Sequence, residues 1–259
     1  MRLVAALIAF ALPTLARANA YSPDRFEIQV YDVEITPPRQ ASLELHVNSV
    51  VGGGTTVTSP DGELPTHHML HMTVEPHLGL TRFMEVGAYI QAAVRADGIL
   101  DYAGLKERVK LRWPTLVKGF GFAINFEISE VPEAYEANRY GSEIRPIVDF
   151  RWQRLYASVN PIVGIDLAGA LAGHAQFEPA AKVSVRVVDG LALGAEYYGA
   201  IGPLDAVAPL DQQSHKLFGV LDANFAVRGL VIDVDAGAGY GFTGDDRWVV
   251  KAIVGISGS

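Results

Sequence analysis

The chain has 259 residues, a formal net charge of −8 at pH 7 and no cysteine. The acidic balance argues against nucleic acid as a partner, and the lack of cysteine excludes disulfides and thiol chemistry. Hydrophobic residues make up 49% of the chain, yet no apolar run after residue 20 reaches the roughly 18 residues that a spanning helix needs. This combination is unusual for a soluble enzyme and typical of a transmembrane β-barrel.

The first twenty residues predict a secretory signal peptide. Arg2 supplies the positive start, an apolar core follows, and Ala18-Asn19-Ala20 forms a small-residue cleavage site. Cleavage is expected after Ala20. An uncleaved membrane anchor is the weaker alternative, because the apolar run is short and contains Pro13.

Residues 21–41 are predicted to form an N-terminal extended segment ahead of the barrel. The core of this segment, FEIQVYDVEI at residues 26–35, resembles a further strand. Counting it as a strand of the barrel would place the mature N-terminus outside the cell. We therefore assign it to a segment that lies in the periplasm or in the lumen.

From residue 42 onward, apolar and polar residues alternate with a period of two. In GFGFAINFEIS, for example, Ile124 and Phe126 alternate with Asn125 and Glu127. This is the period of a strand and not of a helix. Twelve segments follow the pattern, each long enough for a tilted strand to cross a bilayer: 42–53, 68–80, 83–95, 104–113, 119–130, 142–153, 155–167, 175–188, 191–201, 215–227, 230–241 and 247–257.

The connections and the two faces of these segments favour a membrane. Connections are mostly long after odd-numbered segments and mostly tight after even-numbered ones, as in an outer-membrane barrel. The apolar faces carry almost no charge, and Trp113, Trp152 and Trp248 lie at segment ends, where interfacial aromatic residues belong. A soluble sandwich or lipocalin-like barrel would also alternate, with its apolar face inward. We predict an all-β fold in which residues 42–259 form a transmembrane antiparallel up-and-down β-barrel of about 12 strands.

Prolines fall within several of these segments. Pro76, Pro146, Pro161 and Pro179 all lie on the apolar face. A closed barrel has no free edge at which a residue without an N–H is harmless. We therefore expect β-bulges at these four positions.

The polar faces give the predicted pore lining. Residues 104–113 contribute four cations at a spacing of two, which form one continuous basic stripe. The stripe comprises Lys106, Arg108, Lys110 and Arg112, and the rest of the predicted lining comprises Glu85, Glu127, Arg145, Asp149, Arg151, Asp233 and Asp235. Two interpretations remain open. Either an ion-pair network partly fills the lumen, or a narrow pore carries a transverse field that acts on polar solutes.

The stretch THHMLHMTVEPHLGL at residues 66–80 contains four histidines. Read with a period of two, His71 and Glu75 face inward beside His46 of the preceding segment, so these three are weak candidate metal ligands. We favour a hydrogen-bonded patch of lumen wall, and we expect no metal or other cofactor. Ser42 or Ser49 near His46 has no catalytic motif around it, so no enzyme activity is predicted.

Three stretches carry a family resemblance: FEIQVYDVEITPPRQASLELHVNSV, GLTRFMEVGAYIQ and KERVKLRW. They resemble a proteobacterial outer-membrane "transporter" family labelled MetA-pathway of phenol degradation, most clearly over residues 26–130. The resemblance implies a channel or diffusion transporter for small solutes, aromatic or apolar ones among them. The partners implied are outer-membrane lipid, the barrel-assembly machinery and the solute, and the oligomeric state stays open. A structural or plugged barrel without transport is the first alternative, and an outer-membrane hydrolase is the second.

Overall fold

The computed structural model describes residues 22–56, 63–136, 139–169 and 172–258. The predicted signal peptide therefore lies outside the described residues. No helix among the described residues is long and apolar enough to cross a membrane.

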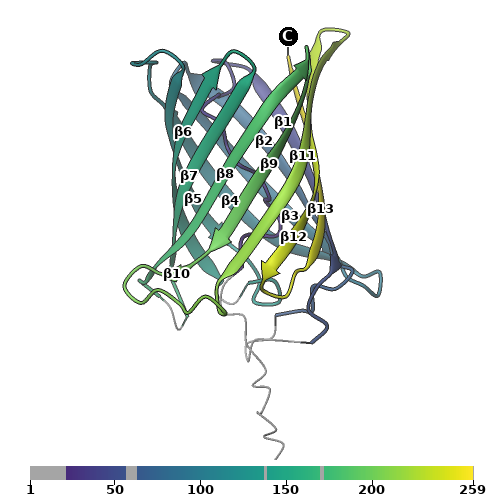
Figure 1. Cartoon of the computed structure of the whole chain (residues 1–259). Helices are drawn as coiled ribbons and strands as arrows, with labels where there is room; N and C mark the ends of the chain where they lie inside the picture. The colour runs from purple at the N-terminus through teal and green to yellow at the C-terminus, as the bar shows by residue number, and fades with distance from the viewer. Residues whose placement is uncertain (1–21, 57–62, 137–138, 170–171, 259) are drawn as a thin grey trace, which may run out of the picture.

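Twelve long antiparallel strands form a closed barrel (Figure 1). Each strand pairs with its neighbours in the chain, β13 pairs with β1, and β9 joins β8 to β11. The long strands are β1 (Ala41–Gly52), β2 (Leu70–Thr81), β3 (Met84–Val94), β4 (Leu100–Arg112), β5 (Phe120–Glu130), β6 (Tyr140–Trp152), β7 (Leu155–Asp166), β8 (Ala175–Val188), β9 (Leu191–Ala200), β11 (Ser214–Val227), β12 (Leu230–Thr243) and β13 (Trp248–Gly258). The two-residue strand β10 (Gly202–Pro203) adds to the edge of β8. The predicted up-and-down barrel is confirmed.

The first residue of a predicted segment lies within two residues of the first residue of an observed strand in eleven of the twelve cases. The exception is β4. It begins at Leu100, whereas the sequence predicted residue 104. Gln91 of β3 pairs with Gly104 and Ala92 pairs with Tyr102, so Ala103 is an extra residue in the ladder. Gly104 takes a φ of 145°, and Ala103 and Gly104 are both buried. This bulge breaks the alternation and hides the first part of the strand from a period-two reading.

The barrel exposes apolar side chains and buries polar ones, which is the reverse of a soluble protein. Large apolar side chains such as Ile90 and Val159 are exposed, at 50% and 51%, whereas Glu75 and Asn125 are fully buried. Soluble proteins rarely bury such groups and rarely expose so much contiguous apolar surface. The outer face therefore suits lipid, and the inner face carries the polar groups.

The prolines do not cause bulges. The β2–β3 register is the same on both sides of Pro76, since Val74 pairs with Ile90 and His77 with Gly87. The β6–β7 register is likewise unchanged across Pro146, and Pro161 and Pro179 are partners in the β7–β8 ladder. The expectation of bulges was wrong because a missing N–H removes ladder hydrogen bonds without requiring an extra residue.

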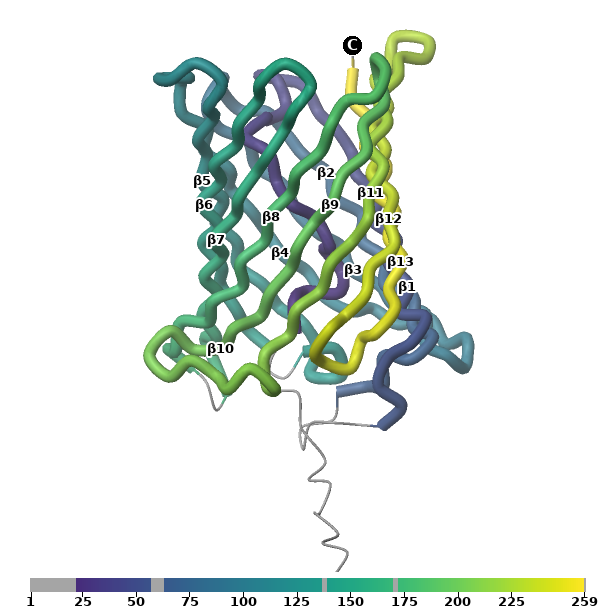
Figure 2. The backbone as a smooth tube through the Cα atoms, in the orientation of Figure 1, coloured from purple at the N-terminus to yellow at the C-terminus, as the bar shows by residue number. Residues whose placement is uncertain are grey.

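The long connections gather at one end of the barrel and the tight turns at the other, where the C-terminus also lies (Figure 1). The N-terminal segment, residues 22–40, runs inside the barrel between these ends (Figure 2). It starts at the long-loop end and reaches β1 at the tight-turn end, where Arg39 N–H donates to the Gly79 carbonyl at 2.7 Å. Of the two predicted locations, the lumenal one is therefore observed. The first described residue lies at the opposite end from the C-terminus.

Candidate permeation pathway

The N-terminal segment is anchored at the long-loop end by a buried carboxylate. Asp246, between β12 and β13, accepts from Arg25 Nε at 2.8 Å, from Lys216 Nζ at 3.0 Å and from Thr66 Oγ1 at 2.6 Å. Burial alone would raise the pKa of Asp246, but the cations Arg25 and Lys216 outweigh it and lower this pKa well below its usual range. The Asp246 carboxylate is therefore held ionised, and it links the N-terminal segment to the barrel wall.

The basic stripe of β4 holds the acidic groups of the segment. Lys106 forms an ion pair with Asp24. Lys110 Nζ donates to the Glu34 carbonyl at 2.6 Å, and Arg112 Nη1 contacts the Glu34 carboxylate at 2.7 Å. Three of the four cations of the stripe thus make polar contacts with the segment, and the fourth, Arg108, lies 5.5 Å from the centre of the Tyr31 ring. The sequence showed the stripe but not its partner, because charge spacing does not reveal where a distant segment lies.

Tyr31 is fixed at the centre of the lumen. Its backbone N–H donates to Asn160 Oδ1 at 2.7 Å, and its carbonyl accepts from Ser158 Oγ at 2.6 Å. Its ring lies 4.2 Å below the guanidinium of Arg145, within the range of a cation–π contact. Its hydroxyl hydrogen-bonds that of Tyr89. These contacts satisfy both backbone groups of a residue that no barrel strand pairs with.

Apolar side chains of the segment form part of an internal core. Ile28 and Val30 pack with Phe218 and Tyr198 from the wall. Further along, Val33 and Tyr31 pack with Ala123 and Ile147. The inner face is therefore not uniformly polar, and the segment fills the middle of the lumen by ordinary hydrophobic packing.

A second ion-pair network lies on the wall made by β8, β9, β12 and β13. Lys182 Nζ is 2.9 Å from Glu196 and 2.7 Å from Asp235. Lys251 pairs with the same two carboxylates and also donates to the Ile28 carbonyl at 3.1 Å. Buried carboxylates and amines of this kind are tolerated because each charge has an opposite partner.

The histidine cluster is a set of polar contacts in the wall. His46 Nε2 lies 3.0 Å from Glu75 and 3.5 Å from Glu44, and these three residues can bring one ligand atom each within 4.8 Å of one another. His71 is not part of the group, because its ring packs edge-on against Phe26 with centroids 4.7 Å apart. Of the weak candidate ligands His46, His71 and Glu75, the structure thus brings together His46 and Glu75 but not His71.

The geometry around Glu75 suits an ion pair better than a metal ion. Arg108 Nε lies 2.7 Å from Glu75 Oε1. A fixed guanidinium at this distance repels a second cation and already uses the carboxylate. The Ser42 hydroxyl has another partner, since Ser42 Oγ lies 2.7 Å from Thr36 Oγ1 while His46 faces Glu44 and Glu75.

Two cavities lie beside the segment within the part of the chain that the structure describes. The larger, about 760 Å³, lies towards the tight-turn end and includes Tyr31, Lys110, Arg151, Lys182 and Asp235 in its lining. The smaller, about 110 Å³, lies at the long-loop end and includes Asp24, Lys106 and Glu127. The two cavities share no lining residue.

All eleven residues predicted to line a pore lie on the inner face. Lys106 and Glu127 line the smaller cavity, and Glu85, Arg108, Lys110, Arg151, Asp233 and Asp235 line the larger one. The remaining three contact the segment or a neighbouring acid: Arg145 reaches Glu27 at 2.9 Å, Asp149 Oδ2 accepts from the Val33 N–H at 3.4 Å, and Arg112 contacts Glu34. Their placement agrees with the period-two assignment, and their role in permeation stays a prediction.

Comparison with known proteins identifies the fold. No protein-family model and no curated protein matches the chain. Among solved structures, the KdgM porin matches with a TM-score of 0.53 at 8% identity, covering 84% of this chain and 98% of its own. The NanC porin matches with a TM-score of 0.53 at 8% identity, covering 85% and 99%. A second KdgM structure, in complex with disordered oligogalacturonate, gives 0.51 at 8% identity, covering 84% and 98%. At this identity the likeness shows that the chain has the porin-type β-barrel fold of outer-membrane proteins.

Proposed function

We propose that the protein is an outer-membrane channel that admits small solutes through a lumen narrowed by its own N-terminal segment. The observation that carries the proposal is the cavity of about 760 Å³, lined by lysine, arginine and carboxylate side chains, inside a barrel of the porin type. A wall of this kind favours water and polar solutes over lipid. The long loops face outward and the tight turns face the periplasm in this proposal.

The finer points of the proposal rest on the sequence. Cleavage after Ala20 would leave a mature chain that begins just before the described segment. The resemblance to the MetA-pathway of phenol degradation family adds aromatic or apolar solutes to the proposal. The larger cavity supports this in part, since Val30, Tyr31 and Tyr156 stand in its lining beside the charged groups.

A plugged barrel is the second candidate function, and one specific observation favours it. Ile28 and Val30 pack against the wall in the middle of the lumen, and the cavities at its two ends share no lining residue, so the docked segment narrows the route between them. In a plugged barrel, transport requires the segment to move or a solute to displace it. A protein whose segment never leaves would serve as a structural barrel only.

Conductance in planar bilayers separates the two candidates. The mature protein, purified from outer membranes and shown to be heat-modifiable on a gel, is expected to give discrete conductance steps and solute flux into liposomes. Protein that is folded and inserted but gives neither current nor flux would contradict the channel proposal and leave the plugged barrel. Recovery of the mature chain from the soluble periplasm would contradict the membrane assignment itself.

A further inference from the structure

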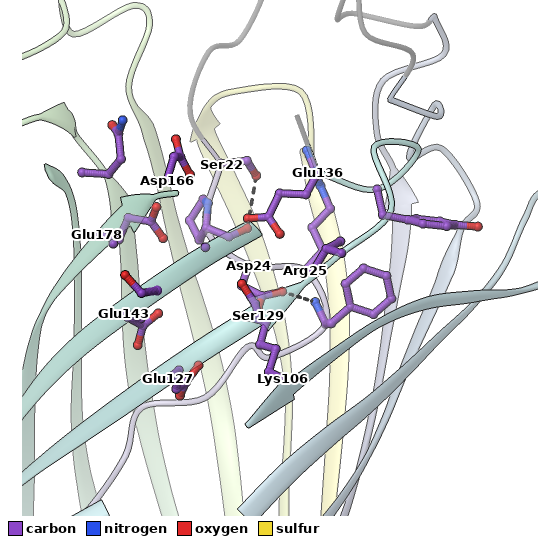
Figure 3. Close-up of a pocket in the computed structure, with 18 of the residues that line it drawn as sticks. Ser22, Asp24, Arg25, Lys106, Glu127, Ser129, Glu136, Glu143, Asp166 and Glu178 are labelled. Atoms are coloured by element: carbon purple, nitrogen blue, oxygen red, sulfur yellow. Dashed lines mark hydrogen bonds and ion pairs between the residues drawn. The ribbon is translucent and has the colours of Figure 1, made fainter. Parts of the chain in front are cut away.

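The smaller cavity at the long-loop end is strongly acidic. Its lining includes six carboxylates against the cations Lys106 and Arg25 (Figure 3). The carboxylates are Asp24, Glu127, Glu136, Glu143, Asp166 and Glu178. They come from the N-terminal segment, from β5, β6, β7 and β8, and from the loop after β5, so six separate parts of the chain converge on one space (Figure 3). Both cations are already engaged, Lys106 by Asp24 and Arg25 by Asp246.

Some of these carboxylates are neutralised by the protein and some are not. Glu143 is paired with Arg145 at 2.7 Å, and Asp24 with Lys106. Within the described residues, neither Glu136 nor Glu178 lies within ion-pair distance of a cation. The carboxyl groups of Glu136 and Glu178 therefore have no cationic side chain as a partner among these residues.

Buried polar atoms without partners point into the same cavity. Gln91 is 1% exposed and Gln176 is 7% exposed, and neither the oxygen nor the nitrogen of either amide has a hydrogen-bond partner among the described residues. Glu127, 4% exposed, likewise leaves Oε2 unpaired. All three side chains line this cavity. Leaving buried groups unpaired is costly, so the unpaired oxygens of Gln91, Gln176 and Glu127 suit a ligand with hydrogen-bond donors.

The spacing of the oxygens selects the kind of cation. The one acidic group within the described residues that gathers three ligand atoms within 4.8 Å is that of Glu44, His46 and Glu75, which lies elsewhere. The carboxylates of the smaller cavity are more widely spread, which suits an ion with N–H donors in several directions better than a compact metal ion. At about 10–15 Å³ per water, a volume of about 110 Å³ also holds a small organic cation.

We propose that this cavity is a binding site for small organic cations with several N–H donors, such as guanidinium or primary ammonium groups. The charged N–H groups meet Glu127, Glu136 and Glu178 from different sides. The amide oxygens of Gln91 and Gln176 accept further hydrogen bonds. The inference deepens the proposed function, because it names the class of solute that the channel would select at its outer mouth.

Ligand-detected NMR on the detergent-solubilised barrel tests the site without any transport. Methylguanidinium and tetramethylammonium carry the same charge, and each has a methyl signal, but only methylguanidinium has N–H donors. Saturation transfer is expected to methylguanidinium and to be about tenfold weaker to tetramethylammonium, since the donors carry the selectivity. Mg²⁺ is expected to compete poorly. Equal transfer to both organic cations, or displacement of methylguanidinium by Mg²⁺ at low concentration, would overturn the proposal.

Two variants and a matched control locate the binding. Glu178→Gln keeps the shape of the side chain and removes its charge, and Gln91→Leu removes the buried amide. Each is expected to raise the dissociation constant for methylguanidinium about tenfold. Asp97→Asn removes one charge from an exposed loop position at the same end of the barrel, outside the cavity lining, and is expected to change nothing. Equal effects in all three would indicate general surface attraction and refute the site.

The bilayer measurement keeps this proposal separate from the proposed function. Binding without any conductance would refute the channel and leave the site intact. Conductance without binding, and with no preference of methylguanidinium over tetramethylammonium, would refute the site and leave the channel intact.

Discussion

Reversing the charge of Glu27 is expected to release the N-terminal segment from the lumen. Glu27 and Arg145 form an ion pair at 2.9 Å in which the two side chains are 0% and 3% exposed. Breaking a buried pair by changing one partner costs about 3–5 kcal/mol. Arg145 keeps its ion pair with Glu143 at 2.7 Å, so the cost of Glu27→Lys is expected at the lower end of this range. A cost of about 3 kcal/mol shifts the balance between docked and released segment by a factor of about 10².

Conductance in planar bilayers at about 1 M salt reports the free cross-section, because the Debye length of about 3 Å screens the field of the new charge. Glu27→Lys is expected to conduct severalfold more than the parent protein. Asp233→Lys makes the same charge change at a wall residue that lines the larger cavity and whose side chain contacts Asn224, so it serves as the control. The reasoning is refuted if the segment leaves the lumen in Glu27→Lys while the conductance stays at the level of the control.

Three further outcomes follow from the geometry. Since the neighbouring cations lower the pKa of Asp246, its ionised form stabilises the anchored segment above the unfolded value of about 3.9, and this stabilisation is lost as the pH falls through the lowered folded pKa. Protease cleavage near Arg25 should therefore stay slow from about pH 5 to pH 8 and speed up only in stronger acid; faster cleavage already near pH 6 would contradict this. Gly79→Ala should lower the unfolding temperature on heat-modifiability gels, at a cost of about 1–3 kcal/mol, because an added Cβ would meet the backbone carbonyls of Thr36 and Pro37. Gly219→Ala, with no atom within 4 Å of its Cβ, should have little effect on that temperature, and equal losses would rule out the contact as the cause. Zn²⁺ should leave the unfolding temperature unchanged, because Arg108 already forms an ion pair with the Glu75 carboxylate. A rise in this temperature that His46→Ala abolishes would instead show a metal site.

The barrel itself was predictable because its signal is local. Each strand needs only its own alternation, and residues such as Ile124 and Glu127 carry that alternation regardless of which strands they pair with. The start of β4 was missed for the same reason, since the bulge at Ala103 and Gly104 depends on pairing with β3. The period-two pattern reports on each strand alone and not on its pairing with other strands.

The interior was predictable only as a list of inward residues. The sequence assigned all four cations of the basic stripe to the inner face. The residues of the N-terminal segment that Lys106, Lys110 and Arg112 contact lie about 70 or more residues away in the chain. The segment has its own charged and apolar residues in a pattern that fits a strand equally well. Its path through the lumen follows from the sum of many long-range contacts, and no single motif encodes it.

The histidine cluster contains Glu44 where the sequence suggested His71. This difference also arises because side-chain contacts between strands depend on how the strands pair. Period two places His46, His71 and Glu75 on one face, and it cannot say how far apart they lie along the barrel. The ladder pairs Asn48 with His71 and Glu44 with Glu75, which puts His71 nearer the long loops than Glu75. Register, which the sequence left open, decides which of these side chains meet.

The most direct test of the lumenal segment is a designed disulfide, because the chain has no cysteine of its own. A Cβ added at Gly121 would lie 2.5 Å from Val33 Cγ2, so Val33→Cys with Gly121→Cys brings two sulfurs within bonding reach once the nearby Asp149 carboxylate turns aside. Oxidation is expected to shift the mobility of this variant on a non-reducing gel. Val33→Cys with Phe122→Cys, whose second cysteine faces lipid, should not shift. Equal cross-linking of both pairs, or of neither, would contradict a segment that lies inside the barrel.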